Sequence, residues 1–136
     1  MKPRGSADLR ARDSQQFHLG VVVLGAGAST RMGRPKMLLP WGGSTIVGHA
    51  INIWRKLGAA QIAVVHAERD VPMITELKRL QLPASGRIAN PAPAQGMFSS
   101  VLCAAQWPRW EIGLTHWLVS LGDQPHLRMS TLHRLV

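Results

Sequence analysis

Short aliphatic runs alternate with amphipathic segments along most of this chain, and this alternation is the feature that most constrains its fold. Runs typical of buried strands occupy residues 20–25, 60–66, 85–90 and 114–122. Segments typical of helices occupy residues 44–58, 71–82, 96–107 and the stretch from Met129 onward. Strands that alternate with helices predict an α/β fold with a mostly parallel sheet and right-handed crossovers.

The parallel sheet predicts where a ligand would bind. In open sheets of this kind, ligands bind at the carboxyl ends of the strands. Three unusual segments each follow a predicted strand: "LGAGASTRMGRPKMLLP" from Leu24, "NPAPAQGMFSS" from Asn90 and "LGDQP" from Leu121. We therefore expect these three segments to meet at one edge of the sheet.

The chain of 136 residues suggests one domain, at residues 19–136. Residues 1–18 are polar, basic and aperiodic, and we predict a flexible tail there without a secretory signal. No apolar run approaches the ~18 residues of a membrane span. Cys103 is the single cysteine, which excludes an internal disulfide and favours a cytoplasmic protein.

The distribution of charge points to an anionic ligand. The net charge is +9, and no Asp or Glu occurs from Ser14 to Ala67, although five cations do. A basic region without carboxylates suits a nucleoside triphosphate or a nucleic acid. Three of these cations cluster around one glycine loop rather than along a stripe with interleaved aromatic residues, which argues against nucleic acid.

The glycine loop fits neither of two known phosphate-binding motifs. The dinucleotide fingerprint G-x-G-x-x-G requires a third glycine, and Thr30 occupies that position. The P-loop requires G-x-x-x-x-G-K-[ST], whereas Gly27 and Gly33 are six residues apart and Arg34 follows.

The chemistry of the loop nevertheless suits phosphate. Glycines such as Gly25 and Gly27 allow backbone N–H groups to approach an anion closely. Arg31 offers a planar fork that matches phosphate oxygens, and Lys36 offers a mobile charge. The alternative is a simple Gly/Pro connector with solvated cations.

The other two segments could complete such a site. Asp123 follows a buried strand and could hold Mg²⁺, which takes few protein oxygens in addition to substrate phosphates; it could equally be a turn residue. Gly96 allows the chain to turn into a helix, where Ser99 or Ser100 could contact a base or ribose. Helix capping is the alternative role for these serines.

These three segments, in this order, resemble those of the MobA-like nucleotidyltransferases. "LGAGASTRMGRPKMLLP" resembles their signature L-A-[AG]-G-x-S-x-R-M-G-x-x-K-x-L-[LP]. "NPAPAQGMFSSV" resembles their N-x-x-x-x-x-G-M-x-x-S segment, and "LGDQP" resembles their G-D-x-P turn. The likeness runs from about Gly20 to the end of the chain and is greatest to members that act as molybdenum cofactor cytidylyltransferases.

The resemblance implies a three-layer, Rossmann-like nucleotide-binding domain of the glycosyltransferase-A, or nucleotide-diphospho-sugar transferase, type. It implies an Mg²⁺-dependent enzyme that transfers a nucleotidyl group from a nucleoside triphosphate to a phosphorylated acceptor and releases pyrophosphate. Carried over by position, the catalytic residues are Arg31, Lys36 and Asp123, and Asp123 is the metal ligand. The expected nucleotide-binding residues are Leu24, Gly25, Ala26, Gly27, Ser29, Arg31, Lys36, Asn90, Gly96 and Ser100.

The resemblance also raises the question of substrate. Members that use CTP have alanine where this chain has Ala26, and members that use GTP have glycine, so we expect CTP as donor and molybdopterin as acceptor. The alternatives are GTP, or another acceptor such as a sugar phosphate or methylerythritol phosphate. Molybdoenzymes or their chaperones are the implied protein partners.

Complete family members continue beyond the point at which this chain stops, so we expect the chain to be truncated relative to them. The part beyond usually supplies a further acidic metal ligand and much of the acceptor site. An inactive nucleotide-binding fragment is therefore a further alternative.

Overall fold

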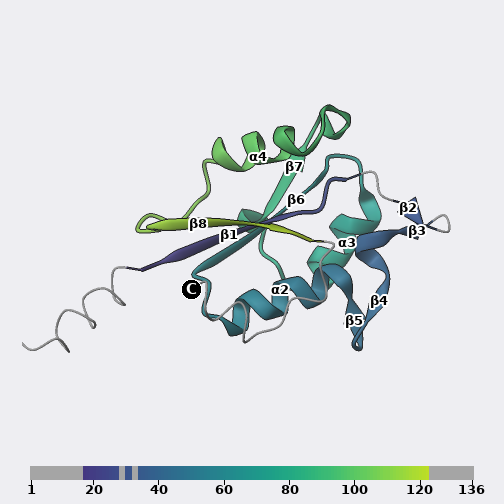
Figure 1. The fold of residues 1–136 in the computed structure, drawn as a ribbon, viewed down its shortest axis with the longest axis horizontal. Coiled ribbons are helices and arrows are strands. Elements are labelled where there is room, and N and C mark those ends of the chain that lie inside the picture. Colours follow the sequence, from purple (N-terminus) through teal and green to yellow (C-terminus); the bar gives the residue numbers. More distant parts are fainter. Residues whose placement is uncertain (1–16, 28–29, 32–33, 123–136) are drawn as a thin grey trace, which may run out of the picture.

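A four-stranded parallel sheet forms the centre of the molecule (Figure 1). The computed structural model describes residues 17–27, 30–31 and 34–122, and only the backbone of Thr30, Arg31 and Arg34. The strands are β1 Leu19–Leu24, β6 Gln61–Ala67, β7 Arg87–Asn90 and β8 His116–Leu121, in the order β7-β6-β1-β8. All three neighbouring pairs are parallel, which confirms the predicted sheet.

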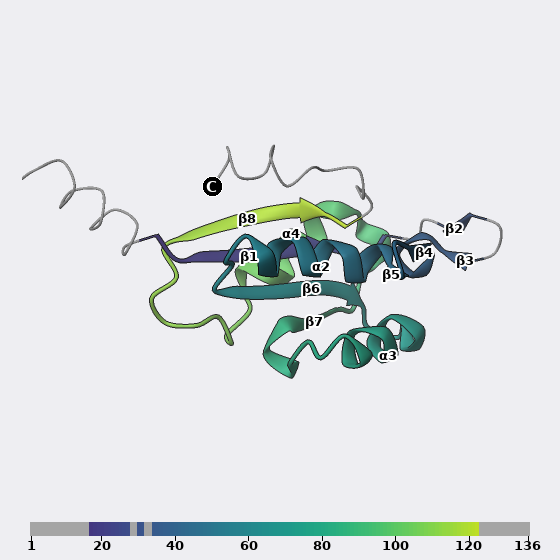
Figure 2. The same ribbon diagram turned by 90° about the horizontal axis from the view of Figure 1, so that it is seen from below.

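The helices cover both faces of the sheet. Helices α2 Ile46–Lys56 and α3 Val71–Arg79 lie on one face, and α4 Met97–Ala105 lies on the other (Figures 1 and 2). Successive side chains of a strand point to opposite faces. Accordingly, Val21 and Val23 pack in the α2 and α3 layer, and Val22 packs in the α4 layer. The predicted three-layer α/β architecture is confirmed.

The larger apolar core lies between the sheet and helices α2 and α3. Ile51 of α2 and Leu77 of α3 are fully buried, and Trp54 is nearly so. Burial of a side chain of this size stabilises the fold by about 1.5–3 kcal/mol. This core explains why the apolar spacing of residues 44–58 correctly predicted α2.

The smaller core lies under α4. Ala26, Val65 and Ile88 pack there against Ala104, with Trp107 and Trp110 at its margin. Strand β8 is at the edge of the described sheet. Two of its side chains, Trp117 and Val119, are about half exposed.

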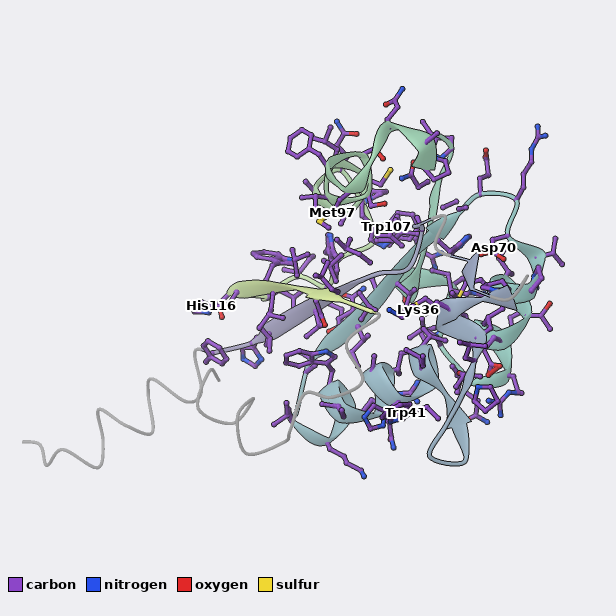
Figure 3. All side chains as sticks on the ribbon, turned by 45° about the vertical axis from the view of Figure 1, so that its right-hand side comes forward. Lys36, Trp41, Asp70, Met97, Trp107 and His116 are labelled. Carbon is purple, nitrogen blue, oxygen red and sulfur yellow. The ribbon has the colours of Figure 1, made fainter. Side chains whose placement is uncertain are left out.

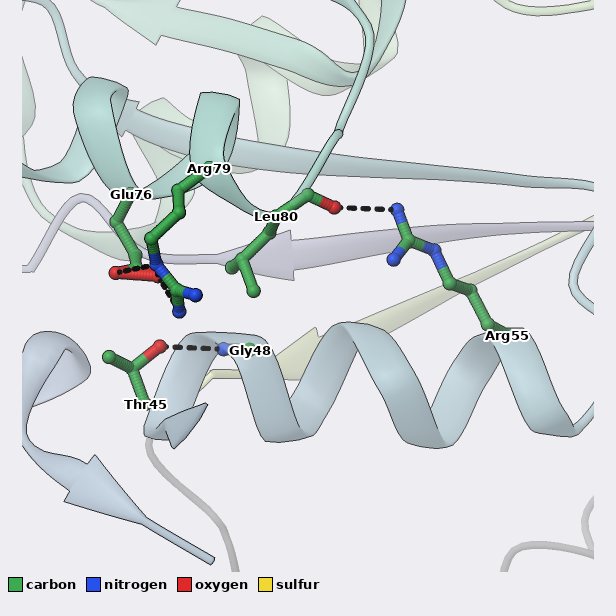
Figure 4. Close-up of polar contacts among 6 residues, drawn as sticks. All are labelled: Thr45, Gly48, Arg55, Glu76, Arg79 and Leu80. Carbon is green, nitrogen blue, oxygen red and sulfur yellow. Dashed lines mark hydrogen bonds and ion pairs between the residues drawn. The ribbon is translucent and has the colours of Figure 1, made fainter. Parts of the chain in front are cut away.

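Side-chain hydrogen bonds define the start of α2 and tie its end to α3 (Figure 4). Thr45 caps α2, because its Oγ1 accepts a hydrogen bond of 3.1 Å from the Gly48 amide. At the other end, Arg55 Nη2 donates to the Leu80 carbonyl at 3.2 Å. On α3, the Glu76 carboxylate pairs with Arg79 and raises the pKa of its guanidinium.

The connection between β1 and α2 contains short elements that the sequence pattern did not predict. Strands β2 Thr30–Arg31 and β3 Arg34–Pro35 pair antiparallel, as do β4 Pro40–Trp41 and β5 Ser44–Thr45. Three short 3₁₀ helices also occur in the described chain: η1 Lys36–Leu38, η2 Ala84–Gly86 and η3 Pro93–Gln95. Elements of two or three residues are too short to show a hydrophobic period.

The end of the predicted N-terminal tail contacts β8. The rings of Phe17 and His116 lie 4.4 Å apart, and the His18 amide donates to Thr115 Oγ1 at 2.8 Å. Residues 1–16 of the predicted tail, and the helix expected from Met129, lie outside the described residues. Within the described part of the chain, no helix has both the length and the apolar character needed to cross a bilayer.

Candidate nucleotide-binding site

A cavity of about 320 Å³ lies at the carboxyl edge of the sheet. Its walls come from the loop after β1, from η1, from the start of α3 and from the start of α4. The lining residues are Leu24, Gly25, Ala26, Gly27, Pro35, Lys36, Met37, Asp70, Met73, Pro93, Gly96, Met97, Ser100 and Leu121. The edge predicted to bind a ligand therefore carries a cavity, bounded by both helical layers.

The loop after β1 brings backbone groups close to this cavity. The Gly25 amide donates to the Val65 carbonyl at 2.8 Å, which holds the loop against β6. A Cβ at Gly25 would lie 3.2 Å from the Val65 carbonyl oxygen, so the position is tight. Gly27 is exposed, and a Cβ there would meet no atom within 4 Å. A ligand can therefore approach the backbone of Gly27 without hindrance.

Lys36 provides positive charge at the cavity. It is the first residue of η1, it is half-buried, and the buried Met37 beside it anchors the segment. Figure 3 shows Lys36 and Asp70 at the same end of the sheet, away from His116 at the start of β8. The lysine expected to contact phosphate thus lines the cavity together with the glycine loop.

The side chain of Asn90, at the end of β7, is hydrogen-bonded to the first turns of α4. Its side chain is 1% exposed, and Nδ2 donates to Ser99 Oγ and Ser100 Oγ at 3.0 Å each. Its Oδ1 accepts from the Ala92 amide at 2.9 Å. Asn90 does not line the cavity, whereas Ser100 does. In this structure, Asn90 therefore positions a cavity residue.

Replacing Asn90 with alanine is expected to lower the free energy of unfolding by about 2–3 kcal/mol, because it leaves buried hydroxyl and amide groups without their partner. Urea denaturation would measure the loss. Asn52→Ala is the matched control, because Asn52 is exposed on α2 and its replacement should not lower the free energy of unfolding. An Asn90→Ala chain as stable as the wild type would show that the network contributes little.

Seven of the residues expected to bind nucleotide line the cavity: Leu24, Gly25, Ala26, Gly27, Lys36, Gly96 and Ser100. Gly96 precedes α4 with φ +96°, a conformation that favours glycine. Ser29 and Asp123 lie outside the described residues, and Arg31 is described only by its backbone in β2, where it pairs with Arg34.

Sequence reasoning missed Asp70. It lines the cavity and caps α3, because its Oδ1 accepts a hydrogen bond of 3.2 Å from the Met73 amide. The available signal was its position four residues after a predicted strand, immediately before the predicted helix at 71–82. The methionines at positions 37, 73 and 97 were also missed, because their side chains converge only in the folded chain.

The described residues do not by themselves form a metal-binding cluster. Across residues 17–27, 30–31 and 34–122, no group of three His, Cys, Asp or Glu side chains could hold a metal ion. Magnesium bound to a nucleotide needs only one or two protein carboxylates, because substrate phosphates and water supply the remaining oxygens.

Comparison with known proteins identifies the family of this chain. Residues 21–136 match the MobA-like NTP transferase domain. The chain belongs to this family. It is 34% identical over 88% of its length to the bifunctional protein GlmU of Leifsonia xyli, and 31% identical over 82% to a probable molybdenum cofactor guanylyltransferase of Mycobacterium ulcerans. These matches span 24% and 60% of the relatives' own lengths.

Solved structures agree on the fold of this MobA-like domain. The crystal structure of Rv0371c from Mycobacterium tuberculosis superposes with a TM-score of 0.62 at 24% identity, covering 88% of this chain and 59% of that one. A second structure of Rv0371c, described as a complex with manganese, superposes with a TM-score of 0.58 at 26% identity, covering 88% and 58%.

Proposed function

We propose that this MobA-like domain binds a nucleoside triphosphate in the cavity and forms the donor site of a nucleotidyltransferase. The observation that carries the proposal is the meeting of the glycine loop, Lys36 and the start of α4 around one cavity. The phosphates would lie against the backbone of Ala26 and Gly27 and the Lys36 ammonium, because the Gly25 amide already donates to the Val65 carbonyl. Ser100, which Asn90 positions, would contact the ribose or base.

The reaction would transfer a nucleotidyl group. An oxygen of the acceptor phosphate attacks the α-phosphorus, the bond from that phosphorus to the bridging oxygen of the β-phosphate breaks, and pyrophosphate leaves. Such a step depends mainly on positioning and on stabilisation of charge. Lys36, and Arg31 on the preceding hairpin, would neutralise the triphosphate and the leaving pyrophosphate.

We propose Asp123 as the protein ligand of a magnesium ion that binds together with the nucleotide. Leu121 lines the cavity, and the Gly122 amide donates to the Leu24 carbonyl at 3.3 Å, so the chain reaches the end of β8 beside the glycine loop. Asp123 is the next residue in the sequence. When bound, magnesium would neutralise phosphate charge and favour departure of the pyrophosphate. The manganese complex of Rv0371c supports a divalent cation in this family.

We infer CTP as the donor and molybdopterin as the acceptor. Ala26 supports CTP, because it lines the cavity at the signature position where members that use CTP have alanine. GTP is the second candidate, favoured by the likeness to a protein named as a guanylyltransferase.

Replacing Ala26 with glycine is expected to shift the ratio of CTP to GTP affinity toward GTP by about fivefold, since removing one methyl group changes binding by roughly 1 kcal/mol. Isothermal titration calorimetry with each nucleotide and Mg²⁺ would measure the ratio. Ala60→Gly is the matched control, because it removes an exposed methyl group outside the cavity lining and should leave the ratio unchanged. A wild-type chain that binds GTP and not CTP would overturn the inference.

A further inference from the structure

We propose that Asp70 selects the nucleobase, by accepting a hydrogen bond from an exocyclic amino group of the type found on cytosine. The inference rests on the proposed function, because it assumes a nucleotide in the cavity. It deepens that function by naming a side chain that distinguishes cytosine from uracil.

The first support is the composition of the cavity wall. Among the described lining residues, only Lys36, Asp70 and Ser100 have polar side chains, and Asp70 is the single acid. A carboxylate repels phosphate, so the triphosphate would lie toward Lys36 and the glycine loop, away from Asp70. The base is the part of the nucleotide that suits the rest of the wall, which is rich in methionine and proline.

The second support is the fixed orientation of the carboxylate. Oδ1 accepts from the Met73 amide at 3.2 Å, which ties the side chain to the first turn of α3. Within the described part of the chain, Oδ2 has no hydrogen-bond partner, although Asp70 is only half-buried. One oxygen is thus held by the helix, and the other remains available to a donor on a ligand.

The third support is the chemistry of the two pyrimidines. An ionised carboxylate only accepts hydrogen bonds. Cytosine carries an amino group at C4, which donates, whereas uracil carries a carbonyl oxygen there, which accepts. Asp70 would therefore attract cytosine and repel uracil. A contact between Asp70 and the ribose would not distinguish CTP from UTP, because both nucleotides carry the same ribose.

Asp70→Asn tests the assignment without removing the cap, because asparagine is as good an N-cap residue as aspartate. Titration calorimetry with CTP and with UTP, each with Mg²⁺, should show the wild type preferring CTP by roughly 10-fold or more, as expected for a hydrogen bond to a charged group. The variant should lose most of that preference, because an amide can donate to the C4 carbonyl of uracil. Asp70→Ser should also lose the preference, since serine keeps a capping oxygen but is too short to reach the base.

Glu68→Gln is the matched control, because Glu68 is exposed on the same loop and does not line the cavity; it should keep the wild-type preference. If Asp70→Asn weakens CTP and UTP equally, or leaves their ratio within twofold of wild type, the assignment is wrong while the proposed function stands. If the wild-type chain binds neither nucleotide, the proposed function fails and the assignment fails with it.

Discussion

Lys36→Ala is expected to weaken the binding of CTP, measured in the presence of Mg²⁺, by about 10- to 100-fold. Lys36 lines the cavity from the first position of η1 and is half-buried there. A hydrogen bond from an ammonium to a phosphate oxygen contributes about 1.5–3 kcal/mol, and partial burial reduces solvent screening. Calorimetric titration of CTP in the presence of Mg²⁺ would measure the loss.

Two further variants test whether Lys36 acts by contacting phosphate or only by adding to the positive charge of the protein. Lys56→Ala removes a cation from the exposed last turn of α2, outside the cavity lining, and should leave CTP affinity unchanged. Lys36→Arg should restore part of the affinity, because arginine retains the charge in a different geometry. A Lys36→Ala chain with an affinity within threefold of wild type would remove Lys36 from the phosphate site.

Gly86→Ala is expected to lower the free energy of unfolding by about 3 kcal/mol. Gly86 is buried at the end of η2, directly before β7. A Cβ there would lie 2.6 Å from the Ile62 carbonyl oxygen and 3.1 Å from Leu82 Cγ. Because the closer atom belongs to the backbone of β6, relief requires the two strands to shift, and overpacking of this kind typically costs about 1–3 kcal/mol.

Urea denaturation would measure this effect, with Gly27→Ala as the matched control. An added methyl group at Gly27 meets no atom within 4 Å. The free energy of unfolding of the Gly27→Ala chain should therefore differ from wild type by less than about 0.5 kcal/mol. Equal stability of the Gly86→Ala and Gly27→Ala chains would show that β7 can move away from β6 at little cost. The approach of β7 to β6 matters for the site because β7 ends at Asn90.

The main elements of the fold could be predicted because each has a clear hydrophobic pattern. The run of valines in β1 and the apolar face of α2 define their elements without reference to the rest of the chain. The two small hairpins between them could not be predicted. Their strands are two residues long, and their pairing depends on the path of the chain from β1 to α2.

The candidate site could be predicted in part. The glycine loop and Lys36 were found because glycine spacing and local charge are visible in the sequence. The role of Asn90 in positioning Ser100 could not be predicted from the sequence. Its hydrogen bonds to Ser99 and Ser100 depend on how β7 meets α4. Asp70 was missed for a similar reason, since its local pattern indicates only a helix cap.

The most direct test of the central claim is calorimetric titration of this chain with CTP, with and without Mg²⁺. We predict saturable binding of one nucleotide per chain, strengthened by Mg²⁺ and weakened by Lys36→Ala. Absence of binding by a chain that still unfolds cooperatively would contradict the assignment of this cavity as a nucleotide site.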